Sequence, residues 1–123
     1  MKFKINLLKS RNFEISNDRL IKYIIIHFTG MKNQRLAIKR LQSQVAKVSC
    51  HYLISKRGKV FQLVEDKNIA WHAGKSRWET DVNLNSKSIG IELVNKGNEM
   101  YPELQIKALI KLISILKKKY KIK

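Results

Sequence analysis

Apolar residues recur along the chain with two different periods, which predict where strands and helices lie. The run 21–26 is apolar except for Lys22 and rich in β-branched residues, so it predicts a strand buried on both faces. Residues 50–55 and 59–64 form two further strand-like runs, and the short link that contains Gly58 predicts a β-hairpin between them. Residues 88–94 predict another strand, whose apolar positions alternate with Gly90, Glu92 and Val94.

Two other segments repeat apolar residues at the spacing of a helix. In the segment 33–47, Lys39 and Arg40 fall on the side that is expected to face solvent. Pro102 suits the first position of a second helix, which continues to about Tyr120. The apolar side of the first helix consists of Leu36, Ala37, Leu41 and Val45.

The remaining segments carry weaker patterns. Residues 1–20 show no clear period and predict an extended lead-in, and the polar residues 65–87 predict a long loop that contains both tryptophans. No internal repeat or second domain is visible. The pattern as a whole predicts a single α/β domain, residues 1–123, in which helices flank one mixed central β-sheet.

The charge of the chain is unusual: 26 Lys and Arg oppose 9 acids, which gives a net charge of +17. Such a chain is attracted to polyanions, although the even spread of lysines fits a biased surface composition equally well. No helix-turn-helix phrase, zinc finger or RNP-like strand points to a specific nucleic-acid partner. No run approaches the about 20 apolar residues of a membrane span, and no secretory signal is visible, so a cytoplasmic location is expected.

Two residues on predicted strands are candidates for chemistry. His27 closes the apolar run 21–26, at a strand end where sites gather in α/β proteins. Glu92 is the only acid inside an apolar strand, where desolvation raises a carboxyl pKa toward the range that a general base needs. The alternatives are a packed histidine and an acid paired with a lysine on a half-exposed strand. Cys50, the single cysteine, lacks an evident orienting partner for a nucleophile.

The loop around Gly74 gathers aromatic side chains that suit a sugar-peptide ligand. Trp71 and Trp78 can pack on sugar rings, and His72 can hydrogen-bond the carbonyl groups of a peptide. The alternative for Trp71 is a place in the core.

Four phrases in this order, at residues 24–29, 48–54, 70–74 and 88–93, resemble the zinc-dependent N-acetylmuramoyl-L-alanine amidases of the type-2 amidase and peptidoglycan-recognition superfamily. They read I-I-I-H-F-T, V-S-C-H-Y-L-I, A-W-H-A-G and S-I-G-I-E-L. The resemblance implies that fold, and hydrolysis of the amide between N-acetylmuramic acid and L-alanine in peptidoglycan fragments. It also implies site roles: zinc ligand His27, catalytic acid/base Glu92, and a muropeptide groove at Trp71 and His72 with Asn85 nearby. A histidine at the position of His51 is not a ligand in that family.

The family's second and third zinc ligands belong to a segment of the form H-x-x-I-x-P-x-R-K-x-D-P-G, which follows its last helix. No such segment is found in these 123 residues. The expectation is therefore a domain truncated at its C-terminus relative to the family, with an incomplete zinc site and little hydrolysis by the chain alone. Three alternatives stay open: a separate chain that supplies the segment, a non-catalytic muropeptide-binding module, and an inactive remnant.

Overall fold

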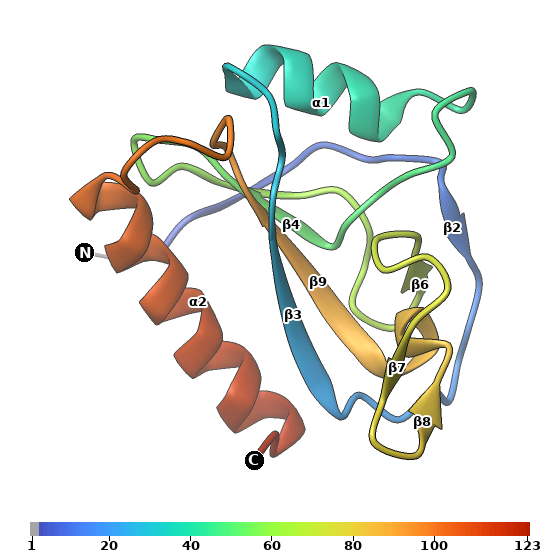
Figure 1. Ribbon diagram of the computed structural model, residues 1–123. Coiled ribbons are helices and arrows are strands. Elements are labelled where there is room, and N and C mark those ends of the chain that lie inside the picture. Colours follow the sequence, from blue (N-terminus) through green and yellow to red (C-terminus); the bar gives the residue numbers. More distant parts are fainter. Residues whose placement is uncertain (1–2) are drawn as a thin grey trace.

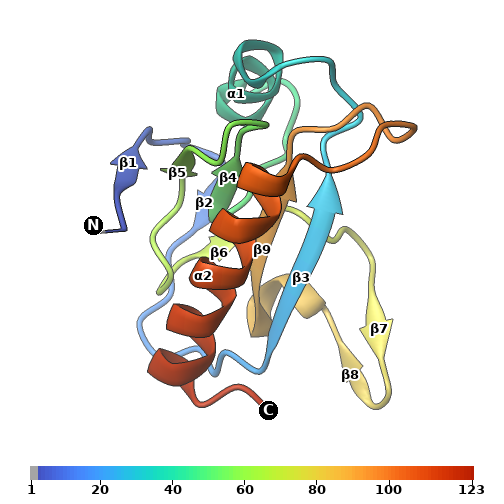
Figure 2. The ribbon, with the colours of Figure 1, turned by 90° about the vertical axis from the view of Figure 1, so that its left-hand side faces the viewer.

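The computed structural model describes residues 3–123, so Met1 and Lys2 of the expected lead-in lie outside the described residues. A five-stranded mixed sheet forms the centre of the molecule (Figure 1). Its strand order, β1-β5-β4-β9-β3, can be followed in Figure 2. The three neighbours β4, β9 and β3 are parallel, whereas β5 runs antiparallel to β4 and parallel to β1. The strands are β1 (Ile5–Leu7), β3 (Tyr23–Phe28), β4 (Tyr52–Ile54), β5 (Val60–Gln62) and β9 (Ser88–Leu93).

Two helices cover opposite faces of this sheet, which confirms the predicted fold class. The long helix α2 (Glu103–Tyr120) crosses one face, where Leu112 packs in a core that includes Ile54 and Ile91 (Figure 2). The helix α1 (Gln34–Gln42) lies on the other face, where Ala37 and Leu41 pack in a second core with Leu53 and Phe61. Neighbouring residues of β4 thus enter different cores, because successive side chains of a strand point to opposite faces.

The two helices differ from the prediction at their ends. Asn33 caps α1 by accepting the backbone N–H of Leu36 at 3.0 Å, but the helix ends at Gln42 rather than Lys47. Val45, which was expected in the core, is therefore 91% exposed. Pro102 is the N-cap of α2 and not its first helical residue; its carbonyl accepts the N–H of Ile106 at 3.1 Å.

The segments predicted as lead-in and loop contain short strands that only tertiary contacts explain. In the lead-in, β1 joins the sheet edge, and β2 (Phe13–Glu14) pairs with the distant β6 (Ile69–Ala70). The loop 65–87 folds into a small hairpin, β7 (Arg77–Trp78) and β8 (Asp81–Val82), followed by the 3₁₀-helix Leu84–Lys87. Strands of two residues are too short to show a period in the sequence.

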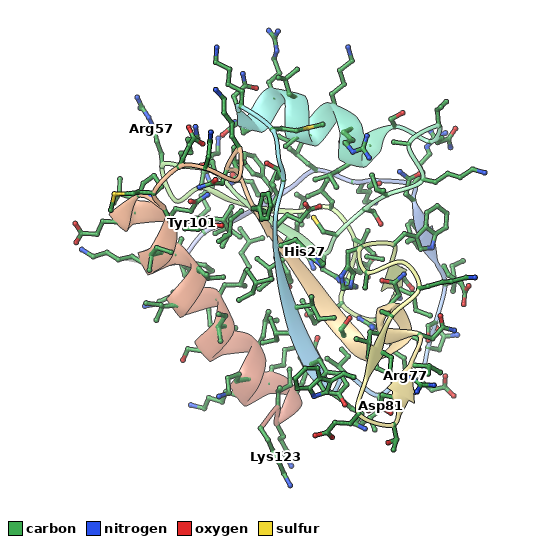
Figure 3. All side chains as sticks on the ribbon, viewed as in Figure 1. His27, Arg57, Arg77, Asp81, Tyr101 and Lys123 are labelled. Carbon is green, nitrogen blue, oxygen red and sulfur yellow. The ribbon has the colours of Figure 1, made fainter. Side chains whose placement is uncertain are left out.

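Asp81 fixes the hairpin against the start of β3 (Figure 3). Its carboxylate accepts a hydrogen bond from the Tyr23 hydroxyl and forms ion pairs with Lys22 at 2.6 Å and Lys87 at 3.3 Å. These partners hold the pKa of Asp81 well below its usual value, chiefly through Lys22. Within residues 3–123, neither helix is long and apolar enough to cross a lipid bilayer.

Candidate active site

A pocket of about 220 Å³ lies on the α1 face of the sheet, where β3 and β9 end. The parallel register pairs His27 with Glu92, so the two side chains point to the same face at the same level (Figure 3 labels His27). Trp71, His72 and Arg40 also line the pocket. The pocket thus holds four of the five residues to which the resemblance assigns site roles, and Asn85, the fifth, lies just behind them. Trp78, the second tryptophan considered as a sugar contact, does not line this pocket.

The ring of His72 can lie against β9 and reach the pocket because residue 90 of this strand is a glycine and has no side chain. A Cβ atom added to Gly90 would lie 2.5 Å from Cδ2 of the His72 ring, which is closer than real contacts allow. Residue 90 must therefore be glycine, because any larger residue would collide with the ring of His72. Asn85 holds the same loop, because its Oδ1 accepts the backbone N–H groups of His72 at 3.2 Å and Ala73 at 2.8 Å.

A chain of hydrogen bonds fixes the proton positions on the two pocket histidines. The Ser88 hydroxyl donates to the carbonyl of Leu84 at 2.6 Å, so it accepts from Nε2–H of His72 at 3.1 Å. Nδ1 of His72 is then the acceptor for Nε2–H of His27 at 3.0 Å. The network leaves Nδ1 of His27 without a proton. The sequence did not indicate Ser88, which stands at the start of a strand like many structural serines.

Both pocket histidines are neutral near pH 7. Burial lowers the pKa of His27, and burial together with the nearby His51 and His27 lowers the pKa of His72 to about 3. A neutral imidazole offers one lone pair to a proton, a hydrogen-bond donor or a metal.

Glu92 has the perturbed carboxyl group that its sequence context predicts. Burial raises its pKa to about 7, and the positive charge of Arg40 opposes that rise. A carboxyl group that titrates near neutral pH can both take and return a proton, as acid-base catalysis requires. The expected shift is confirmed, whereas the catalytic role stays a prediction.

Two other candidates lie outside the pocket. His51 is fully buried; its Nδ1 accepts the N–H of Gly90 at 3.0 Å, and its Nε2 donates to the carbonyl of Asn68 at 2.8 Å. These are the bonds of a structural histidine. Burial raises the pKa of the Cys50 thiol well above its usual value, which disfavours the thiolate that a nucleophile needs.

Zinc fits these residues only in part. Over residues 3–123, no group of three or more His, Cys, Asp and Glu side chains is placed to hold a metal ion. Catalytic zinc usually takes three protein ligands and a water molecule, and His27 and His72 are hydrogen-bonded to each other. The described residues therefore do not fit a catalytic zinc ion on their own.

Arg40 has a place in the site that the sequence did not predict. Helical spacing placed it on the solvent side; it is exposed, but it also lines the pocket that holds Glu92. Its position on the last turn of a short helix hides this role, because only the packing of α1 against the sheet turns that end toward the pocket.

Comparison with known proteins decides the family. The model of the family described as N-acetylmuramoyl-L-alanine amidase matches residues 17–123. This chain belongs to the N-acetylmuramoyl-L-alanine amidase family. The amidase AmiD of Escherichia coli is 34% identical over a match covering 84% of this chain and 42% of AmiD. The 1,6-anhydro-N-acetylmuramyl-L-alanine amidase AmpD of Haemophilus influenzae is also 34% identical, over 80% of this chain and 53% of AmpD. This chain thus spans about half the length of these relatives.

Solved structures agree with this family assignment. The complex of E. coli AmiD with the substrate anhydro-N-acetylmuramic acid-L-Ala-D-γ-Glu-L-Lys superposes with a TM-score of 0.78, covering 84% of this chain and 45% of AmiD, at 34% identity. A Drosophila peptidoglycan recognition protein, PGRP-SA, superposes with a TM-score of 0.69, covering 97% of this chain and 75% of that protein. At 17% identity the second likeness shows the fold alone.

Proposed function

We propose that this chain is the domain of an N-acetylmuramoyl-L-alanine amidase that binds peptidoglycan fragments and hydrolyses the amide between N-acetylmuramic acid and L-alanine. One observation carries the proposal: the pocket joins His27, His72 and Glu92, which come from three separate phrases of the family. Phrases that are far apart in the sequence, yet meet in one cavity, are expected of a working site rather than of packing alone.

In this proposal each pocket residue has a separate task. Glu92 takes a proton from the attacking water and returns it to the leaving amine, for which its pKa of about 7 is suited. Trp71 packs against the sugar, and His72 and Asn85 contact or position the peptide. His27 is the residue of this chain that we propose as a zinc ligand; among residues 3–123, no group of three or more His, Cys, Asp and Glu side chains completes such a site.

The proposed ligand is a 1,6-anhydro-muropeptide. The name of AmpD and the AmiD complex both specify the anhydro sugar for those relatives. A cytoplasmic location, where such fragments would be recycled, remains a prediction from the sequence.

The test is mass spectrometry of anhydro-N-acetylmuramic acid-L-Ala-D-γ-Glu-L-Lys incubated with the chain and added zinc. Hydrolysis by this chain predicts that the wild type releases the free tripeptide and that Glu92→Gln releases about 10²- to 10⁴-fold less, because the variant lacks the acid-base group. Equal release by both proteins would remove Glu92 from the mechanism. No release by the wild type would contradict hydrolysis by this chain.

A second candidate, a muropeptide-binding module without catalysis, is favoured by the incomplete metal donor set beside an aromatic-lined pocket. It predicts that the chain retains the same muropeptide in equilibrium dialysis, that no tripeptide is released, and that Trp71→Ala weakens retention. A separate polypeptide that supplies further zinc ligands stays a prediction, and nothing in the comparisons supports it.

A further inference from the structure

Arg40 is a charged residue at the pocket whose guanidinium has no ion-pair partner among the described residues. Within residues 3–123, its guanidinium takes part in none of the ion pairs, which join lysines to Asp66, Asp81, Glu65, Glu99 and Glu103. By contrast, the guanidinium of Arg19 donates to the carbonyl groups of Asp66 and Ser88. Arg19 is used by the fold, whereas Arg40 is left available.

The position of Arg40 directs its charge into the candidate active site. It lines the same 220 Å³ pocket as Glu92, and its charge is felt by that carboxyl group, yet no ion pair joins the two. Among the described residues that line the pocket, Arg40 is the only lysine or arginine. A planar guanidinium at such a site suits a carboxylate, which it can bind through two parallel hydrogen bonds.

The proposed ligand has a free carboxylate close to the amide that is cleaved. In L-Ala-D-γ-Glu-L-Lys the chain continues through the γ-carbonyl of glutamate, so the α-carboxylate of that residue is free. Only the alanine separates this glutamate from the amide that is cleaved, a span of about 4–7 Å. Arg40 lines the same cavity as Glu92, the residue proposed to act on that amide.

We infer that Arg40 binds the free α-carboxylate of the γ-linked glutamate, and this inference rests on the proposed function. The site then selects muropeptides whose second residue is glutamate over those in which it is amidated to isoglutamine. Arg40 is a specificity-determining residue in this account, because it recognises the peptide and takes no part in breaking the bond.

The test is a matched pair of ligands measured by isothermal titration calorimetry in metal-free buffer at 150 mM salt, so that binding is measured without cleavage. The ligands are anhydro-N-acetylmuramic acid-L-Ala-D-γ-Glu-L-Lys and its isoglutamine counterpart. The proteins are the full wild-type chain, Arg40→Gln, Arg40→Lys and the control Lys39→Gln. The control removes one charge from the same turn of α1, at a position that does not line the pocket.

We expect the wild type and Lys39→Gln to bind the glutamate ligand about tenfold more tightly than the isoglutamine ligand. Arg40→Gln should lose this preference by weakening only the glutamate ligand, and Arg40→Lys should keep part of it. Equal binding of the two ligands by the wild type would overturn the inference while leaving the proposed function intact. An equal loss for both ligands in Arg40→Gln would also overturn it. Failure of the wild type to bind either ligand would overturn the proposed function as well.

Discussion

Two groups of polar side chains are built around histidines whose rings lie 6.1 Å apart, those of His72 and His51. In the first group, the pocket, Glu92 is half-buried and Arg40 is exposed, and neither is engaged in an ion pair among the described residues. In the second group, which we call the Asp66 network, Arg19, His51, Tyr52, Asp66 and Tyr120 bind one another or nearby backbone groups. The pocket leaves its charged side chains available to a ligand. The polar side chains of the Asp66 network are instead hydrogen-bonded within the protein.

The Asp66 network ties the end of α2 to the sheet. The Asp66 carboxylate accepts the hydroxyls of Tyr52 at 2.6 Å and Tyr120 at 2.5 Å. Burial raises the pKa of both tyrosines, and the neighbouring Asp66 raises each further, so both remain protonated donors. The Arg19 guanidinium lies 3.1 Å from Nε2 of His51, but both are donors there, so Arg19 acts on His51 through its charge.

The comparison teaches that a buried histidine or carboxyl group is not functional by itself. His51 and His72 are both neutral and both in contact with Gly90, yet only His72 borders a cavity. We therefore expect substitutions in the Asp66 network to lower the free energy of unfolding. Substitutions of polar residues in the pocket should leave it nearly unaltered.

The largest expected loss of stability is for His51→Leu. Leucine leaves the N–H of Gly90 and the carbonyl of Asn68 buried without partners, which we expect to lower the free energy of unfolding by about 3–4 kcal/mol. Urea denaturation followed by circular dichroism measures the change. A loss below about 1 kcal/mol would mean that the two groups find other partners and that the network is not decisive.

The network should also make stability depend on pH. Burial, with a further contribution from the charge of Arg19, lowers the pKa of His51 from 6.5 to about 4 in the folded chain. Between these values the unfolded chain binds more protons, so this contribution is complete above pH 6.5 and is lost as the pH falls toward 4. The contribution of the His51 pKa shift to the free energy of unfolding is about 3 kcal/mol.

Since His72 and Glu92 also titrate, the measured quantity is the difference between the wild type and His51→Asn, taken from urea denaturation at a series of pH values. Asparagine can still accept the Gly90 N–H but does not titrate. A difference that stays constant from pH 7 to 4 would contradict the assigned pKa of His51.

Gly90→Ala tests the contact between the two groups. The added methyl group collides with the His72 ring, and we expect a cost of about 2 kcal/mol. In a His72→Ala background the same change should cost less than about 1 kcal/mol, because the obstructing ring is gone. The double-mutant cycle is measured by urea denaturation. If the effects of Gly90→Ala and His72→Ala on the free energy of unfolding simply add, the added methyl group does not collide with the His72 ring.

Tyr120→Phe removes one hydrogen bond from the edge of the Asp66 network. We expect it to lower the free energy of unfolding by about 1 kcal/mol. The control is Tyr101→Phe, since Tyr101 is exposed and should be neutral within about 0.5 kcal/mol. If the two variants lose the same amount, the hydroxyl of Tyr120 does not tie α2 to the sheet.

The smallest expected effect on stability is that of Glu92→Gln in the pocket. At pH 6 the carboxyl group is mostly protonated, because burial raises its pKa to about 7, so the amide replaces a neutral group of similar shape. We expect a change within about 0.5 kcal/mol, measured by thermal and urea denaturation. A clear loss of stability would show that Glu92 supports the fold, which would weaken its assignment to catalysis.

Much of this protein could be predicted from its sequence. The apolar runs at 21–26 and 88–94 predicted the two parallel strands that carry His27 and Glu92. The prediction that the first of them is buried on both faces is wrong, because β3 lies at the edge of the sheet, where Ile26 is 44% exposed. The raised pKa of Glu92 was also predictable, since an acid between Ile91 and Leu93 is desolvated in any fold that buries the strand.

Other features depended on contacts between residues that are far apart in the chain. The pairing of β2 with β6, the close approach of His72 to Gly90, and the closed bonding of His51 each need the folded sheet. Sequence periodicity predicted correctly that Arg40 is exposed, but it did not predict that Arg40 lines the pocket, because periodicity reports the faces of a helix and not what lies beyond its end. The sequence by itself determined where the main strands and helices form and which reactive residue types they carry. Tertiary packing decided that His51 is enclosed and that His72 borders the pocket, because neighbours in space set the burial and the hydrogen-bond partners of a side chain.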